Sequence, residues 1–119
     1  MRILVIDDDE MVLQILAEML TTAGYEVGEA RHGNEGVKLY RQEPFDLVIT
    51  DLLMPEKDGL EVIMELRRDF PDVKIITLSG GGSYGYSSVD ASKTLGAVRA
   101  LQKPVMEEQL LGAVREVLG

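Results

Sequence analysis

The chain has 119 residues, 45% of them hydrophobic, which fits one globular domain with a hydrophobic core. Its formal net charge of −9 argues against direct binding of nucleic acid or an anionic membrane, because both require a basic surface. No apolar stretch approaches the ~20 residues of a membrane-spanning helix, the N-terminus lacks a signal-peptide pattern, and the absence of cysteine excludes disulfides, so we expect a cytoplasmic protein.

Two hydrophobic periodicities alternate along the chain. Short apolar, β-branched runs predict strands that are buried on both faces, at residues 3–6, 25–29, 47–50, 73–78 and 98–102. Apolar residues at helical spacing predict five helices between and after them, at residues 10–23, 34–42, 59–70, 84–95 and 106–118. Asn34 and Asp58 are expected to be the N-caps of the second and third helices. Five βα units predict a single doubly wound α/β domain over residues 1–119, with a five-stranded parallel sheet and helices on both faces.

Polar residues follow the predicted strands at the edge where ligands bind in doubly wound sheets. Asp7 and Asp8 follow the first strand, and Asp51 follows the third. Ser79 and Lys103 follow the fourth and fifth strands. One aspartate after a strand is often only a helix cap or a turn residue. The combination at four strand ends predicts a site made of three carboxylates, a hydroxyl and an ammonium.

The residue types of this site favour chemistry on a phosphoryl group. Asp7, Asp8 and Asp51 would repel one another at close range, and a hard divalent cation would relieve that repulsion. Mg²⁺ prefers oxygen ligands, usually takes one or two protein carboxylates, and also binds phosphate. Lys103 and Ser79 would add a positive charge and a hydrogen-bond donor, and an aspartate can itself accept a phosphoryl group.

With these residues in place, the chain resembles the receiver domain of two-component response regulators. The matching stretches are IDDDE at residues 6–10, TDLLMPEKDG at 50–59, LSGG at 78–81 and KP at 103–104, in the order and spacing of that family. The resemblance covers essentially the whole chain and implies the flavodoxin-like strand order 2-1-3-4-5.

The resemblance also implies a role for each part of the site. Asp51 would accept a phosphoryl group from a phosphohistidine on a sensor histidine kinase or a histidine phosphotransfer protein, and the domain would then switch its binding to an unknown output protein. Lys103 would pair with the phosphate, and Ser79 would donate a hydrogen bond to it. The bond between Lys103 and Pro104 would be cis.

The same resemblance implies a Mg²⁺ site. Asp8 and Asp51 would bind the ion directly, together with the backbone carbonyl of Leu53. Asp7 would act through a metal-bound water. The apolar Leu53 stands where polar residues can help to position the hydrolytic water, so the lifetime of the aspartyl phosphate is not predicted.

Two further features depart from the usual receiver pattern. Ala100 occupies the position of the Tyr or Phe whose ring turns inward on activation, so that readout cannot operate here. Three glycines at 80–82 follow Ser79 and make a permissive loop. We hypothesise that this loop and the following helix, together residues 80–95, carry the conformational change instead.

Two alternative functions stay open at this point. The pattern Asp7-x-Asp9 after a strand resembles the opening of haloacid-dehalogenase-like phosphatases, in which Asp7 would be the nucleophile. That fold generally needs a longer chain, and it leaves Asp51 without a role. The other alternative is an interaction module that keeps the receiver fold without being phosphorylated.

The start of the first helix carries two more predictions. Asp9 is expected to cap this helix rather than to join the metal site. Met11 and Ile15 are left over from the predicted core stripe, so they are either a widened stripe or a docking patch for the phosphodonor. The sequence leaves open whether the receiver stands alone or belongs to a longer regulator.

Overall fold

The computed structural model describes all residues except 53, 55–56 and 81–95. Within the described residues, a parallel sheet of five strands has the order β2-β1-β3-β4-β5. Its strands are β1 (Arg2–Ile6), β2 (Glu26–Ala30), β3 (Leu47–Asp51), β4 (Ile75–Ser79) and β5 (Arg99–Gln102). The helices are α1 (Glu10–Thr22), α2 (Gly33–Gln42), α3 (Gly59–Asp69) and α5 (Glu107–Leu118). The predicted fold class and strand order are therefore confirmed, and the helix expected at 84–95 lies outside the described residues.

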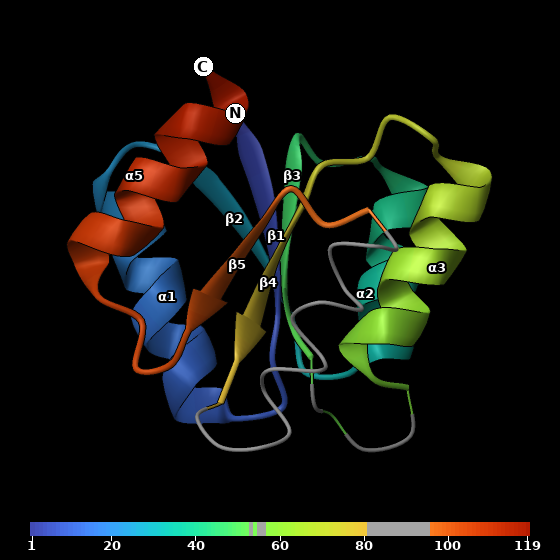
Figure 1. Ribbon diagram of the computed structural model, residues 1–119, viewed down its shortest axis with the longest axis horizontal. Helices are drawn as coiled ribbons and strands as arrows, with labels where there is room; N and C mark the ends of the chain where they lie inside the picture. The colour runs from blue at the N-terminus through green and yellow to red at the C-terminus, as the bar shows by residue number, and fades with distance from the viewer. Residues whose placement is uncertain (53, 55–56, 81–95) are drawn as a thin grey trace.

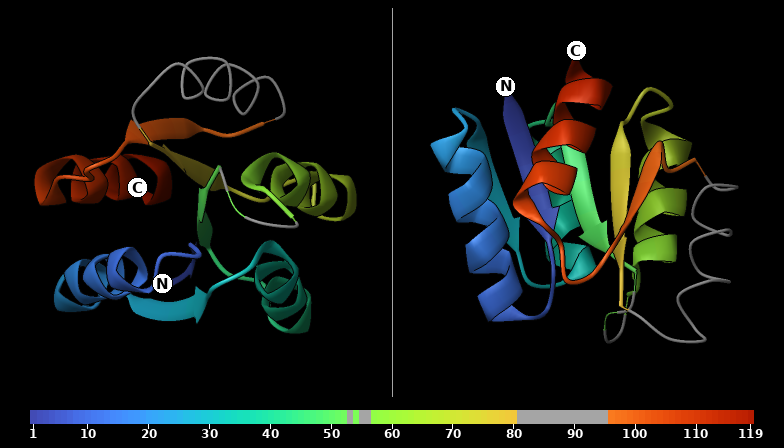
Figure 2. Two further views of the ribbon diagram at one scale, coloured as in Figure 1. Left: turned by 90° about the horizontal axis from the view of Figure 1, so that it is seen from below. Right: turned by 60° about the vertical axis from the view of Figure 1, so that its left-hand side comes forward.

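Helices cover both faces of this sheet. Figure 2 shows α1 and α5 on one side and α2 and α3 on the other. Neighbouring residues of β1 point into different layers: Ile3 and Val5 pack with α1 and α5, whereas Leu4 and Ile6 pack with α2 and α3. Because side chains alternate along a strand, burial on both faces requires a continuous apolar run, which explains the sequence pattern.

The observed elements begin or end one or two residues away from their predicted bounds. The fourth strand begins at Ile75 rather than at residue 73, and it includes Ser79 as its last residue. The prediction of Asn34 as an N-cap is wrong, because α2 begins at Gly33 and His32 is its N-cap. The carboxylate of Glu35 accepts a hydrogen bond from the Arg31 N–H at 3.2 Å. This bond joins the first turn of α2 to the residue before its N-cap, and the helix begins one residue earlier than predicted. Asp58 is confirmed as the N-cap of α3, and its side chain accepts the N–H of Glu61 at 3.0 Å.

All strands of the sheet run in the same direction, so their carboxyl ends meet at one edge, the lower edge in Figure 1. This edge receives the residues that the sequence placed after the strands. None of the helices in the described part of the chain has the length and hydropathy to span a bilayer.

Candidate functional site

Adjacent strands bring the predicted carboxylates together. Asp51 is the last residue of β3, and Asp7 directly follows β1, its neighbour in the sheet. The pairing of Ile6 with Thr50 sets the two aspartates side by side. Asp7 and Asp51 are buried and Asp8 is exposed, and carboxylate oxygens of all three lie within 4.8 Å of one another. The acidic cluster expected from the sequence is therefore formed.

Lys103 reaches this cluster from the end of β5. Its Nζ lies 2.9 Å from Asp7 Oδ2 and 3.2 Å from Asp51 Oδ2. Burial lowers the pKa of Lys103, but its contact with Asp7 and the charges of Asp51 and Asp7 outweigh burial and raise the pKa overall. The ammonium is thus held in its charged form between two carboxylates. The peptide bond between Lys103 and Pro104 is cis, as the family resemblance implied.

The surroundings of the Asp7 carboxylate indicate whether a divalent cation fits this cluster. Asp7 Oδ1 accepts the N–H of Asp9 at 2.9 Å. Asp7 Oδ2 is buried, and its partner is the Lys103 ammonium at 2.9 Å; among the described residues no other group bonds to this oxygen. A buried oxygen with an unused lone pair, beside two more carboxylates, matches the all-oxygen ligation of Mg²⁺. The residues present therefore fit the ion.

Ser79 joins the same edge as the last residue of β4. Asp51 pairs with Leu78 in the sheet, so Ser79 lies one residue beyond Asp51 along the strand direction. Its backbone carbonyl accepts the N–H of Lys103 at 2.7 Å, which ties the ends of β4 and β5 together. The Leu53 carbonyl and most of the glycine-containing segment 80–95 lie outside the described residues. Their predicted roles stay predictions.

The three adjacent acids after β1 have different environments. Asp9 Oδ1 accepts the N–H groups of Met11 at 3.0 Å and Val12 at 3.3 Å, so Asp9 is confirmed as the N-cap of α1. Its carboxylate also lies at the positive end of the helix dipole. Asp7 and Asp8 belong to the acidic cluster instead.

Two apolar side chains of α1 stay outside the core. Met11 is 71% exposed and Ile15 is 45% exposed, whereas Leu16 of the same helix is buried. A widened core stripe is therefore not the reason for this pair.

Ala100 lies in β5 opposite Thr77 of β4, where the sequence placed it.

The sequence reasoning missed Gly59 as a residue of this site. A Cβ atom on Gly59 would overlap the carbonyl oxygen of Asp51 and would lie 2.8 Å from Leu52 Cα. The available signal was a glycine in the first turn of a helix, directly after the N-cap Asp58. Glycine disfavours a helix, so its use there indicates a close backbone approach.

Comparison with known proteins identifies the class that this fold and site define. Residues 3–115 match the family model of the response regulator receiver domain. The chain belongs to this family.

Relatives and solved structures agree with this assignment. Chemotaxis protein CheY of Thermotoga maritima is 35% identical over 98% of this chain and 96% of CheY. A response regulator receiver domain protein from Clostridium thermocellum superimposes with a TM-score of 0.92 at 31% identity, over 98% of this chain and 93% of that one. Vibrio cholerae CheY4 gives a TM-score of 0.89 at 30% identity and 98% coverage of both chains.

Other relatives are longer proteins. The transcriptional regulatory protein GlrR of Escherichia coli is 35% identical over 98% of this chain, and response regulator MprA of Mycolicibacterium vanbaalenii is 38% identical over the same share. The chain spans only 26% of GlrR and 50% of MprA. These relatives give no support to the alternative of a haloacid-dehalogenase-like phosphatase.

Proposed function

We propose that this receiver domain, residues 1–119, takes a phosphoryl group onto Asp51 from a phosphohistidine of a sensor histidine kinase or a histidine phosphotransfer protein. The observation that carries the proposal is the position of Lys103, whose Nζ lies within 3.2 Å of Asp51 Oδ2 and 2.9 Å of Asp7 Oδ2. A cation held between two buried carboxylates is placed to neutralise charge that arrives on one of them.

Asp51 is the nucleophile in this proposal. One of its carboxylate oxygens attacks the phosphorus, the bond between phosphorus and the donor imidazole nitrogen breaks, and the electron pair of that bond stays on the imidazole. Lys103 pairs with the transferred group, and the hydroxyl of Ser79 donates a hydrogen bond to one of its oxygens. Most of the catalysis is positioning and charge neutralisation, because the phosphoryl group carries its charge on its outer oxygens.

Asp8 and Asp51 would hold Mg²⁺ directly, with the carbonyl of Leu53, and Asp7 would contact it through water. The bound ion would supply charge neutralisation between the carboxylates and the phosphoryl oxygens. The domain would then be a phosphoacceptor that assists its own phosphorylation and dephosphorylation, rather than an enzyme that turns over a separate substrate. We also propose that it acts in the cytoplasm and that phosphorylation switches binding of an output protein.

Mass spectrometry of peptides tests the acceptor directly. After incubation with acetyl phosphate and Mg²⁺, we expect a phosphate on Asp51, and no label on the Asp51→Asn variant. A label on Asp7 would instead identify the phosphatase-like chemistry. A folded wild-type protein without any label, and with partner binding unchanged in Asp51→Asn, would identify a non-phosphorylated interaction module.

A further inference from the structure

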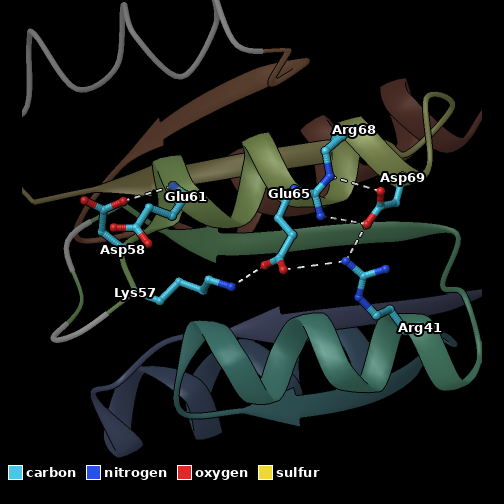
Figure 3. Close-up of polar contacts among 7 residues, drawn as sticks. All are labelled: Arg41, Lys57, Asp58, Glu61, Glu65, Arg68 and Asp69. Atoms are coloured by element: carbon cyan, nitrogen blue, oxygen red, sulfur yellow. Dashed lines mark hydrogen bonds and ion pairs between the residues drawn. The ribbon is translucent and has the colours of Figure 1, made fainter.

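Three consecutive residues enter α3 from the loop that follows the phosphoacceptor. They are Lys57, Asp58 and Gly59. Asp58 caps α3 through the N–H of Glu61, and Figure 3 shows this contact at the start of the helix. Gly59 packs against the end of β3, and Lys57 contacts α2 and α3.

Gly59 joins α3 to the backbone of the phosphoacceptor. Its N–H donates to the carbonyl of Leu52 at 2.9 Å. Any side chain at this position would overlap the carbonyl of Asp51, so the first turn of α3 lies directly against the end of β3. A displacement of residues 57–59 would therefore displace the backbone of Asp51 and Leu52.

The backbone of Lys57 packs against the start of α2. A Cβ atom on Gly33, the first residue of α2, would lie 2.7 Å from the carbonyl oxygen of Lys57 and 2.9 Å from Val62 Cγ2. Contacts this short leave no room for a side chain. The N-terminus of α2 therefore packs directly on the segment that enters α3.

The side chain of Lys57 forms a second attachment. It is 18% exposed and forms an ion pair with Glu65 of α3, which is 27% exposed. The other carboxylate oxygen of Glu65 lies 3.6 Å from the guanidinium of Arg41 in α2. Figure 3 shows the resulting chain of charges from Lys57 through Glu65 to Arg41, here called the Lys57 bridge. The hydrogen bond from Lys57 outweighs burial and, with the nearby cations, holds the pKa of Glu65 below its usual value, so the bridge is charged at neutral pH.

We propose that Lys57 is a positioning residue for the acidic site. The Lys57 bridge ties residues 57–59 to α2 and α3, and Gly59 transmits this fixed position to the backbone that carries Asp51. Isolated exposed ion pairs contribute little, but this pair is partly shielded and belongs to a network of charges, where ion pairs contribute more. The inference rests on the proposed function, since it concerns the alignment of Asp51 with Asp7 and Asp8 for Mg²⁺.

A Mg²⁺ titration separates positioning from simple charge. Replacing Lys57 with methionine removes a cation, and charge alone would make Mg²⁺ bind more tightly. Positioning predicts the opposite sign: Mg²⁺ should bind Lys57→Met more weakly, toward the lower end of the 10- to 100-fold losses typical when residues that orient metal ligands are changed. The dissociation constant would be measured from ¹⁵N–¹H shifts of the Asp8 and Leu52 amides, and the rate of phosphorylation by acetyl phosphate would fall in parallel.

Matched variants keep the test specific. Lys57→Arg and the charge exchange of Lys57→Glu with Glu65→Lys should restore Mg²⁺ affinity toward the wild-type value. Arg68→Gln, which changes a cation of α3 that pairs with Asp69, should leave the affinity within about twofold. If Lys57→Met does not fold, Glu65→Gln, compared with the charge exchange, measures the same coupling from the other partner.

The outcomes distinguish this inference from the function on which it rests. Wild-type protein that neither binds Mg²⁺ nor accepts phosphate would overturn both. Wild-type protein that does both, with unchanged or tighter Mg²⁺ binding in Lys57→Met, would overturn the positioning role and leave the proposed function standing. Weaker binding in Lys57→Met, with no recovery in the charge exchange, would also overturn it, because the bridge would then not be the cause.

Discussion

Lys103 Nζ lies 3.2 Å from Asp51 Oδ2, so the ammonium is already in place where a phosphoryl group on Asp51 would bring negative charge. Lys103→Met keeps the stem of the side chain and removes this charge. We expect phosphorylation by acetyl phosphate to slow by about a hundredfold to a thousandfold, the loss typical when one preorganised electrostatic partner is removed. The same variant should bind Mg²⁺ at least as tightly as the wild type, because a competing cation is gone. A normal rate of phosphorylation in Lys103→Met would contradict this assignment.

Asp8 and Asp9 are adjacent in sequence and should respond differently to the same substitution. Asp8→Ala removes a carboxylate of the acidic cluster and should abolish Mg²⁺-dependent phosphorylation while the protein stays folded. Asp9→Ala removes the N-cap of α1 and should lower the free energy of unfolding by about 1 kcal/mol without abolishing phosphorylation. Urea denaturation and the acetyl phosphate assay measure the two effects independently. Equal loss of phosphorylation in both variants would place Asp9 in the site instead.

The sequence predicted the acidic cluster because one rule places all of its members. Parallel strands end at the same edge, so residues that directly follow strands must meet there, whatever their separation in sequence. Asp7 and Asp51 lie 44 positions apart in the sequence, but their places at the ends of neighbouring strands alone determine that they meet. The same reasoning placed Ser79 and Lys103.

The Lys57 bridge could not be predicted in this way. The ion pair between Lys57 and Glu65 joins a loop to the second turn of a helix, and nothing in their spacing indicates which way either side chain points. The contact with Arg41 depends on how α2 and α3 lie side by side. The predicted start of α2 is wrong by one residue for a similar reason. The Glu35 carboxylate accepts a hydrogen bond from the N–H of Arg31, and the direction of that side chain cannot be read from the sequence.

The exposed pair Met11 and Ile15 leads to a prediction about the phosphodonor. If this patch docks the donor, Met11→Lys and Ile15→Lys should slow transfer from the cognate phosphohistidine protein by at least about tenfold, since a buried charge or a lost apolar anchor costs 1.4 kcal/mol or more. Phosphorylation by acetyl phosphate should be unchanged, because this small donor needs no docking surface. Met64→Lys is the matched control, since Met64 is 55% exposed on α3, on the other side of the sheet. A normal rate of transfer to the α1 variants would show that the patch is not used.

The C-terminal end of α3 predicts a change of stability at low pH. Hydrogen bonds from Arg68 and Arg41 hold the pKa of Asp69 at about 2, below its ordinary value of 3.8. Because the pKa is lower in the folded state, the carboxylate stabilises the fold above the ordinary value, and this contribution is lost as pH falls from about 4 toward 2. Asp69→Asn should therefore be less stable than the wild type at pH 6, with a difference that shrinks across this range and weakens with added salt, as expected for an exposed group. Chemical denaturation between pH 2 and 6, with Asp72→Asn as the control, measures this difference; a gap that stays constant with pH would show that Asp69 acts by packing rather than by charge.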